Sequence, residues 1–233
     1  MAAHFPPPAS ASRIQKRDRI LAAAESCFAE SGFYGTKISD IAASAGVADG
    51  TIYLYFRNKD DLLISWFEWR MEEVAARLVL ATQHATTDNP DQLASAKLGA
   101  FVRAYLEMVK EHPKAAEVLT VELRQSAKFI KEYKNPHFSG FLRLLADILE
   151  SGQVSGEFDD SIPATAASRA IFGALDELAR SWLLGGNTKF DIVRAADWML
   201  RMTLHGLAAQ PQPQPQPQPA KPMPLNHNPR SSR

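Results

Sequence analysis

Residues 36–63, TKISDIAASAGVADGTIYLYFRNKDDLL, place hydroxyl side chains where they could contact a polyanion. Thr51, Tyr53 and Tyr55 follow one another at alternate positions, directly behind the small residues at 48–50. Hydroxyl groups donate hydrogen bonds to phosphate oxygens, a threonine methyl can contact thymine, and small residues let a helix end approach base edges. These residue types predict contacts with the backbone and major groove of DNA.

Two short helices must position these side chains. Spaced apolar residues predict the buried face of the first: Ile38, Ile41, Ala42 and Ala45. Thr36 is expected to cap this helix, with its hydroxyl facing a phosphate, and Gly46 to make the turn after it. The second helix is expected at about 49–55, with Val47 and Ile52 facing inward. This is the layout of a helix-turn-helix, whose second helix enters the major groove.

Spacing alone leaves another interpretation open. Two short helices and a turn occur in many all-α proteins, where Tyr53 and Tyr55 would serve as core residues. Charge does not decide the matter, because the chain has 26 Lys and Arg against 26 Asp and Glu. Residues 1–59 carry only a weak basic excess. DNA binding must therefore rest on the arrangement of side chains rather than on bulk charge.

The rest of the folded chain is also predicted to be helical. A first helix is expected at about 13–31, between a Ser12 cap and Gly32, and a fourth from Asn58 to about 84. Five further helical segments are expected near 91–111, 114–125, 127–151, 163–184 and 188–207. Asn135-Pro136 should kink or split the third of these five. No strand alternation is present, so an all-α fold of about nine helices is expected.

The sequence of residues 36–63 resembles that of the TetR family of one-component repressors. The matching residues are Thr36, Ile41-Ala42, Ala45-Gly46-Val47, Gly50-Thr51-Ile52-Tyr53, Phe56 and Lys59 to Leu63. The resemblance implies a three-helix DNA-binding domain followed by a helical ligand-binding and dimerisation domain. It assigns DNA contacts to Thr36, Lys37, Ala48, Asp49, Gly50, Thr51, Tyr53, Tyr55 and Lys59. Tyr55 departs from the pattern, since the family often has His there.

Further stretches resemble the fatty-acid-degradation regulators (FadR) of the TetR type. They are GVADGTIYLYFRNKDDLLISWF, VELRQS at 121–126, SGQVSGEF at 151–158 and IFGALDELARSW at 171–182. This resemblance implies a homodimer that represses fatty-acid-degradation genes from a palindromic double-stranded operator. Long-chain acyl-CoA would be the effector that releases it, and no cofactor or metal is implied. A TetR-type repressor that responds to a drug or an aromatic compound remains the alternative.

Large apolar residues of the C-terminal part could line a tunnel for such an effector. The candidate ligand-binding residues are Phe101, Tyr105, Arg124, Phe138, Leu142, Phe172 and Trp182. Arg124 is the charged candidate, because it follows an apolar run and is expected to point inward. Each aromatic residue could equally belong to the core.

Four regions follow from these patterns. Residues 1–11 and the Gln-Pro-rich residues 209–233 are expected to be disordered, residues 12–57 to bind DNA, and residues 58–208 to bind ligand and dimerise. The last two helices are expected to pair with their copies as a four-helix bundle, although an intrachain core would show the same pattern.

Other classes of protein find little support. The N-terminus lacks the pattern of a signal peptide, and no apolar run is long enough to span a bilayer. A single cysteine, Cys27, fits a reducing cytoplasm. An enzyme or carrier acting on acyl thioesters would need a nucleophile with a base, or a metal cluster. The six histidines show no HxxxH or HxxE pairing, so no enzyme is expected.

Overall fold

The computed structural model describes residues 11–126, 128–129, 132–133, 136–186 and 190–208. Over these ranges the regular structure is helical, apart from one isolated bridge between Phe158 and Ala208. The all-α prediction is confirmed for this part of the chain. The two predicted disordered regions fall outside the described residues, except that the first helix already begins at Ala11.

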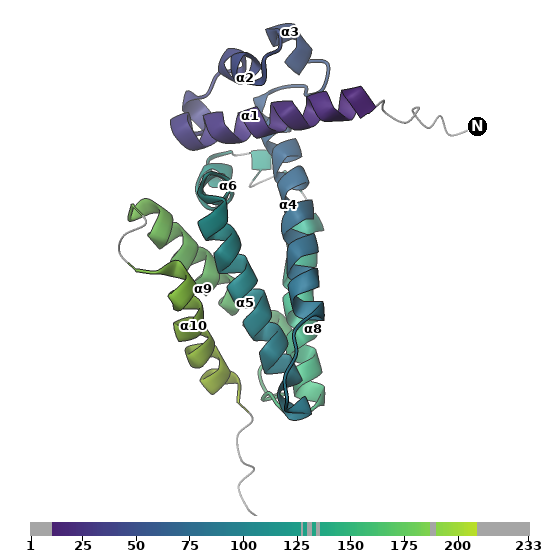
Figure 1. Ribbon diagram of the computed structural model, residues 1–233, viewed down its shortest axis with the longest axis vertical. Helices are drawn as coiled ribbons and strands as arrows, with labels where there is room; N and C mark the ends of the chain where they lie inside the picture. Colours follow the sequence, from purple (N-terminus) through teal and green to yellow (C-terminus); the bar gives the residue numbers. More distant parts are fainter. Residues whose placement is uncertain (1–10, 127, 130–131, 134–135, 187–189, 209–233) are drawn as a thin grey trace, which may run out of the picture.

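The N-terminal helices form a small layer at one end of the molecule (Figure 1). It contains α1 (Ala11–Gly35), α2 (Ile38–Ala45) and the short α3 (Asp49–Ile52). Its core is made of large side chains that are fully or almost fully buried: Ile20, Leu21, Phe28, Ile41, Ile52 and Phe56. Burial of this face, rather than helix propensity, accounts for such short helices being stable.

The long helix α4 (Lys59–Gln83) leaves this layer and runs into the larger helical body (Figure 1). The body continues with α5 (Leu93–Glu111), α6 (Pro113–Thr120), α8 (Pro136–Val154), α9 (Ala164–Leu184) and α10 (Ile192–Leu207). Helix α5 packs between α4 and α10, and α8 packs on α9. Among the helices described, none combines the length and the apolar character that a bilayer crossing requires.

Two predicted helix boundaries are confirmed by their geometry. Gly46 ends α2 in the left-handed conformation, with φ 63°, which a residue with a Cβ adopts only at a cost. The Asn58 side chain caps α4 by accepting a hydrogen bond from the Asp61 backbone N–H at 2.9 Å. Both signals are local, so the sequence carries them plainly.

Other boundaries differ from the prediction. The predicted segment 114–125 divides into α6 and the 3₁₀ helix η2 (Glu122–Gln125), because the chain changes conformation at Val121. Helix α3 ends at Ile52 and not near 55, since the following residues form tight turns with i→i+3 hydrogen bonds. A second 3₁₀ helix, η1 (Pro90–Gln92), precedes α5. Helix α8 begins at Pro136, while Asn135 lies outside the described residues.

The predicted cap of α2 is wrong. Lys37 occupies the N-cap position, and its backbone N–H donates to the Asp40 carboxylate at 3.1 Å. The Thr36 hydroxyl instead donates to the carbonyls of Gly32, at 2.7 Å, and Cys27, at 2.9 Å. Thr36 therefore closes the end of α1, where the interruption at Gly32 leaves backbone carbonyls that need donors.

Gly152 of α8 lies where a side chain would not fit. A Cβ placed there would lie 2.2 Å from a ring carbon of Phe158 and 2.9 Å from the Cβ of Ala94. Since Phe158 is buried, Gly152→Ala is expected to lower the free energy of unfolding by about 1–3 kcal/mol. Gly140→Ala in the same helix is the control, because nothing lies within 4 Å of its added Cβ. Thermal denaturation of both variants measures the difference, and equal melting temperatures would contradict the packing described.

Candidate functional site

The first candidate surface is formed by α3 and the turn before it. Ala48, Asp49 and Gly50 are exposed, and Tyr53 keeps 57% of its surface accessible. Ile52 points the other way and is 1% exposed, so it anchors the helix on the layer beneath. Ala48, Asp49, Gly50 and Tyr53 are thus presented outward by an apolar anchor, as a recognition helix requires, whereas Thr51 and Tyr55 are half-buried.

The basic start of α1 lies beside this surface. The Arg13 guanidinium sits 5.7 Å from the centre of the Tyr55 ring, and that of Arg17 sits 5.9 Å from the Phe56 ring. Such cation–π contacts hold the charges close to α3. Arg13 and Arg17 were not among the predicted contact residues, although the basic run at the start of α1 was an available signal.

Two predicted DNA contacts are engaged in hydrogen bonds within the protein. Thr36 is 2% exposed, and Lys59 is half-buried. The Lys59 ammonium group donates to three backbone carbonyls of the segment 33–36, which contains the last residues of α1 and the residue after it: those of Phe33 at 2.6 Å, Tyr34 at 3.3 Å and Thr36 at 3.0 Å. Lys37, by contrast, is exposed beside α2.

The segment 33–36 is held from the other side by η2. The buried Glu122 carboxylate accepts a hydrogen bond from the Phe33 backbone N–H at 2.6 Å. The Tyr34 hydroxyl donates to the carbonyl of Gln125 at 2.7 Å. A 3₁₀ helix has three residues per turn, so Glu122 and Gln125 share one side of η2. That side faces the N-terminal layer of α1, α2 and α3.

The opposite side of η2 faces a cavity of about 240 Å³ inside the larger body. Leu123 and Arg124 contribute to its wall, with residues from α4, α5, α6, α8 and α9. Of the predicted ligand residues, the lining includes Tyr105, Arg124, Phe138 and Phe172. Phe101, Leu142 and Trp182 do not line it and are buried in the surrounding core.

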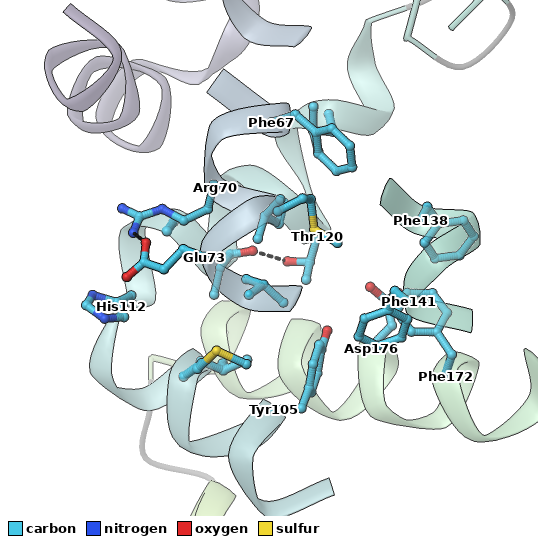
Figure 2. A pocket seen from close by; sticks show the side chains of 18 of the residues that line it. Phe67, Arg70, Glu73, Tyr105, His112, Thr120, Phe138, Phe141, Phe172 and Asp176 are labelled. Carbon is cyan, nitrogen blue, oxygen red and sulfur yellow. Dashed lines mark hydrogen bonds and ion pairs between the residues drawn. The ribbon is translucent and has the colours of Figure 1, made fainter. Parts of the chain in front are cut away.

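The cavity has a charged side and an aromatic side. Figure 2 shows Arg70, Glu73 and His112 together at one side, and Phe138, Phe141 and Phe172 at the other. Glu73 and His112 are exposed, so the charged side opens to solvent. A cavity with this polarity suits an amphipathic molecule whose polar end stays near water.

Aromatic rings close the other side in edge-to-face contacts. The Phe172 ring lies 4.9 Å from Phe138 and 5.2 Å from Phe141. Tyr105 lines the same region, where burial, together with the nearby Asp176 carboxylate, raises the pKa of its phenol well above the usual range. Its hydroxyl is therefore neutral at physiological pH and can donate a hydrogen bond within the cavity. Arg124 forms an ion pair with Asp176 at 2.5 Å beside these rings.

Helix α4 supplies the lining that the sequence interpretation missed. Its contribution is Phe67, Arg70, Met71, Glu73, Val74 and Arg77. Arg70 and Arg77 are seven residues apart, which places them on one face of the helix next to the apolar stripe. In the sequence, the charged residues beside the apolar stripe of this helix were the feature that could have indicated a contribution to the cavity wall. No group of three or more potential metal-ligating side chains was found in the described parts of the chain.

Two family profiles together match residues 20–65 and 69–206 of the chain. The first is described as bacterial regulatory proteins, tetR family, and the second as YsiA-like protein, C-terminal region. The first match contains α2 and α3, and the second contains most of the cavity wall.

Curated and solved relatives agree with these profiles. The fatty acid metabolism regulator protein of Bacillus subtilis (strain 168) is 34% identical over 196 residues, covering 83% of this chain and 97% of the relative. The crystal structure of FadR from Bacillus subtilis in complex with stearoyl-CoA superposes with a TM-score of 0.73 at 33% identity, covering 82% and 98% of the two chains. The fatty acid degradation regulator FadR from Bacillus halodurans gives a TM-score of 0.71 at 34% identity, with the same coverage.

The hydrogen bond between Glu122 and the Phe33 N–H generates a stability prediction. Glu122→Ala leaves this buried N–H without a partner, so the free energy of unfolding should fall by about 1–3 kcal/mol. Glu117→Gln on the adjacent α6 is the control. Burial and the Glu122 carboxylate raise the pKa of Glu117 above its usual value, so its ionised form at neutral pH opposes folding. Urea denaturation at pH 7 should therefore find the control as stable as the parent or slightly more stable. A Glu122→Ala variant as stable as the control would contradict the assignment.

Proposed function

Because this chain belongs to the tetR family of bacterial regulatory proteins, we propose that it represses fatty-acid-degradation genes and leaves its operator when it binds long-chain acyl-CoA. The family predicted from the sequence is confirmed. The chain is a DNA-binding transcription regulator, and its relatives are regulators and not enzymes. Regulators of this family bind operator DNA as dimers.

The observation that carries the proposal is the identity of 34% with the Bacillus fatty acid metabolism regulator over 97% of that protein's length. A related FadR has been solved with stearoyl-CoA. The cavity is consistent with such a ligand, because it joins an aromatic side to a charged rim. An acyl chain would bury apolar surface against the rings, while a polar head would stay near solvent.

We propose the exposed side of α3 as the surface that reads the operator. The proposed DNA-binding residues remain Thr36, Lys37, Ala48, Asp49, Gly50, Thr51, Tyr53, Tyr55 and Lys59. Exposure of Tyr53 and of residues 48–50 supports direct contact. For Thr36 and Lys59 the role we propose is indirect, since their hydrogen bonds to backbone carbonyls at and after the end of α1 position the helices that follow.

Dimerisation would use α9 and α10. Leu184, Trp198 and Met202 expose 59%, 42% and 70% of their surfaces, although all three are apolar. Such residues in the last two helices support a bundle with a second copy. A protein of this kind would act in the cytoplasm, where its DNA lies.

Helix α4 connects the two functions. Its first residue, Lys59, binds backbone carbonyls of the segment 33–36 at the end of α1, and its middle lines the cavity. Ligand would shift α4 and thereby change the distance between the two recognition helices of the dimer. The ligand can change the equilibrium between the two conformations by no more than the difference between its binding free energies for them.

The test starts from an operator selected from random double-stranded DNA with the full-length protein. Fluorescence anisotropy then measures operator affinity as oleoyl-CoA is added. We expect the dissociation constant to rise at least about tenfold, a typical size for an allosteric effect. Unchanged affinity at saturating oleoyl-CoA would remove the acyl-CoA proposal and leave the DNA-binding function intact. Release by an aromatic drug instead would support the alternative effector.

Tyr53 gives a sharper prediction at the DNA surface. Tyr53→Phe removes one exposed hydroxyl without changing the buried anchor of α3, so the fold should be retained. Operator affinity should fall by about tenfold, the equivalent of one hydrogen bond to DNA. Tyr34→Phe removes a hydroxyl that already donates to Gln125, and it should leave operator affinity unchanged. Equal losses in both variants would remove Tyr53 from the proposed contacts.

A further inference from the structure

Arg70 of α4 belongs to two parts of the protein at once. It lines the charged side of the cavity (Figure 2), and its guanidinium binds Glu25 of α1 in the DNA-binding layer. Its Nε and Nη2 atoms donate to Glu25 Oε2 at 3.2 Å and 2.5 Å. The third bond runs from Nη1 to Glu73 on the same helix.

The pair of Arg70 and Glu25 is largely removed from solvent. Their side chains retain 13% and 15% of their accessible surfaces. The indole N–H of the fully buried Trp66 donates to the same Glu25 oxygen at 3.1 Å. Burial opposes the charge on Arg70, but Glu25 and Glu73 outweigh it and raise the pKa of the guanidinium. A buried pair of this kind is costly to break unless another anion replaces the lost partner.

Arg77 offers a natural comparison. It lies two turns further along α4, about 10 Å along the axis, and also lines the cavity. Its carboxylate partner is Glu111, which belongs to α5. Arg70 therefore joins the cavity to the DNA-binding layer, whereas Arg77 joins it to another helix of the same body.

An amphipathic ligand should place its anionic group on this side of the cavity. The apolar end would occupy the aromatic side, because burial of a charged group among phenyl rings is expensive. On the charged side, the guanidinium groups of Arg70 and Arg77 present planar sets of donors that suit carboxylate or phosphate oxygens, Arg77 nearer to solvent than Arg70. His112 adds a further donor there.

We propose that Arg70 is a ligand-contact residue and that an anionic group of the effector takes its guanidinium away from Glu25. This inference rests on the proposed function, because it concerns the same effector. The exchange removes the ion pair between α4 and α1 while supplying a replacement anion to Arg70. The effector anion and the Glu25 carboxylate of α1 then compete for one guanidinium. Effector binding and the ion pair between α4 and α1 are therefore mutually exclusive. No contact between the ligand and the DNA-binding layer is needed.

The competition predicts a gain of affinity, which a purely structural role for Glu25 would not produce. Glu25→Gln keeps an oxygen for Trp66 and removes the competing charge. Oleoyl-CoA should then bind about five- to tenfold more tightly in isothermal titration calorimetry. The ratio of operator dissociation constants with and without effector should fall by a similar factor.

Two control variants separate this exchange from general effects. Arg77→Gln should weaken oleoyl-CoA binding and leave the ratio of operator dissociation constants at saturation as in the parent. Lys114→Gln breaks the exposed ion pair between Lys114 of α6 and Glu30 of α1. Since Lys114 does not line the cavity, neither the ligand affinity nor the ratio should change.

Three ligands identify the anion in the full-length protein. They are oleoyl-CoA, oleate and the uncharged oleoyl thioester of N-acetylcysteamine. Release of the operator by both anions points to any negative head group, and release by oleoyl-CoA alone points to its phosphates. The uncharged thioester should release the operator weakly and bind equally well to the parent and to Glu25→Gln.

Two results would overturn the inference while leaving the proposed function in place. One is an unchanged oleoyl-CoA affinity in Glu25→Gln, and the other is full operator release by the uncharged thioester. If the parent binds none of the three ligands, the proposed effector class fails and the Arg70 exchange fails with it.

Discussion

The backbone segment 33–36, at the end of α1, is held by two opposite charges, and the arrangement of the molecule depends on these contacts. The Lys59 ammonium group binds carbonyl oxygens of the segment, and the Glu122 carboxylate accepts a hydrogen bond from the N–H of Phe33. The interruption of α1 at Gly32 disturbs the helical hydrogen bonding here, so polar groups of the segment would otherwise be unpaired inside the protein. The partners come from α4 and η2, and both of these elements also line the cavity. The requirement to satisfy a few backbone groups therefore places the DNA-binding layer directly on the walls of the ligand site.

Local signals explain what could be predicted from the sequence. Gly46 ends α2 because the left-handed conformation favours glycine, and Asn58 caps α4 through its own side chain. Thr36 and Lys59, which are predicted DNA contacts, also make hydrogen bonds within the protein that the sequence did not predict. The acceptors of Lys59 lie 23 to 26 residues earlier in the chain, so no local pattern identifies them. A threonine or lysine serves equally well as a phosphate ligand or as a donor to backbone carbonyls, and only the tertiary structure decides between these roles.

The cavity shows a second limit of sequence interpretation. Phe101 and Phe172 look alike in the sequence, yet only Phe172 lines the cavity, while Phe101 is fully buried in the core. Apolar periodicity predicts which face of a helix turns inward, but it carries no information on whether side chains or empty space lie opposite. Arg70 was missed for a related reason. Its partner Glu25 is 45 residues away, and the pair becomes visible only when α1 crosses α4.

Because η2 has three residues per turn, its two sides can change differently during the evolution of such a sensor. Leu123 and Arg124 face the cavity, whereas Glu122 and Gln125 bond to the DNA-binding layer. Substitutions at 123 and 124 can thus explore new ligand chemistry while the mechanical connection is preserved. Insertion of a single residue, however, turns everything after it by about 120° and exchanges the two sides. This short segment should therefore tolerate variation in residue type at its inner positions while its length stays invariant.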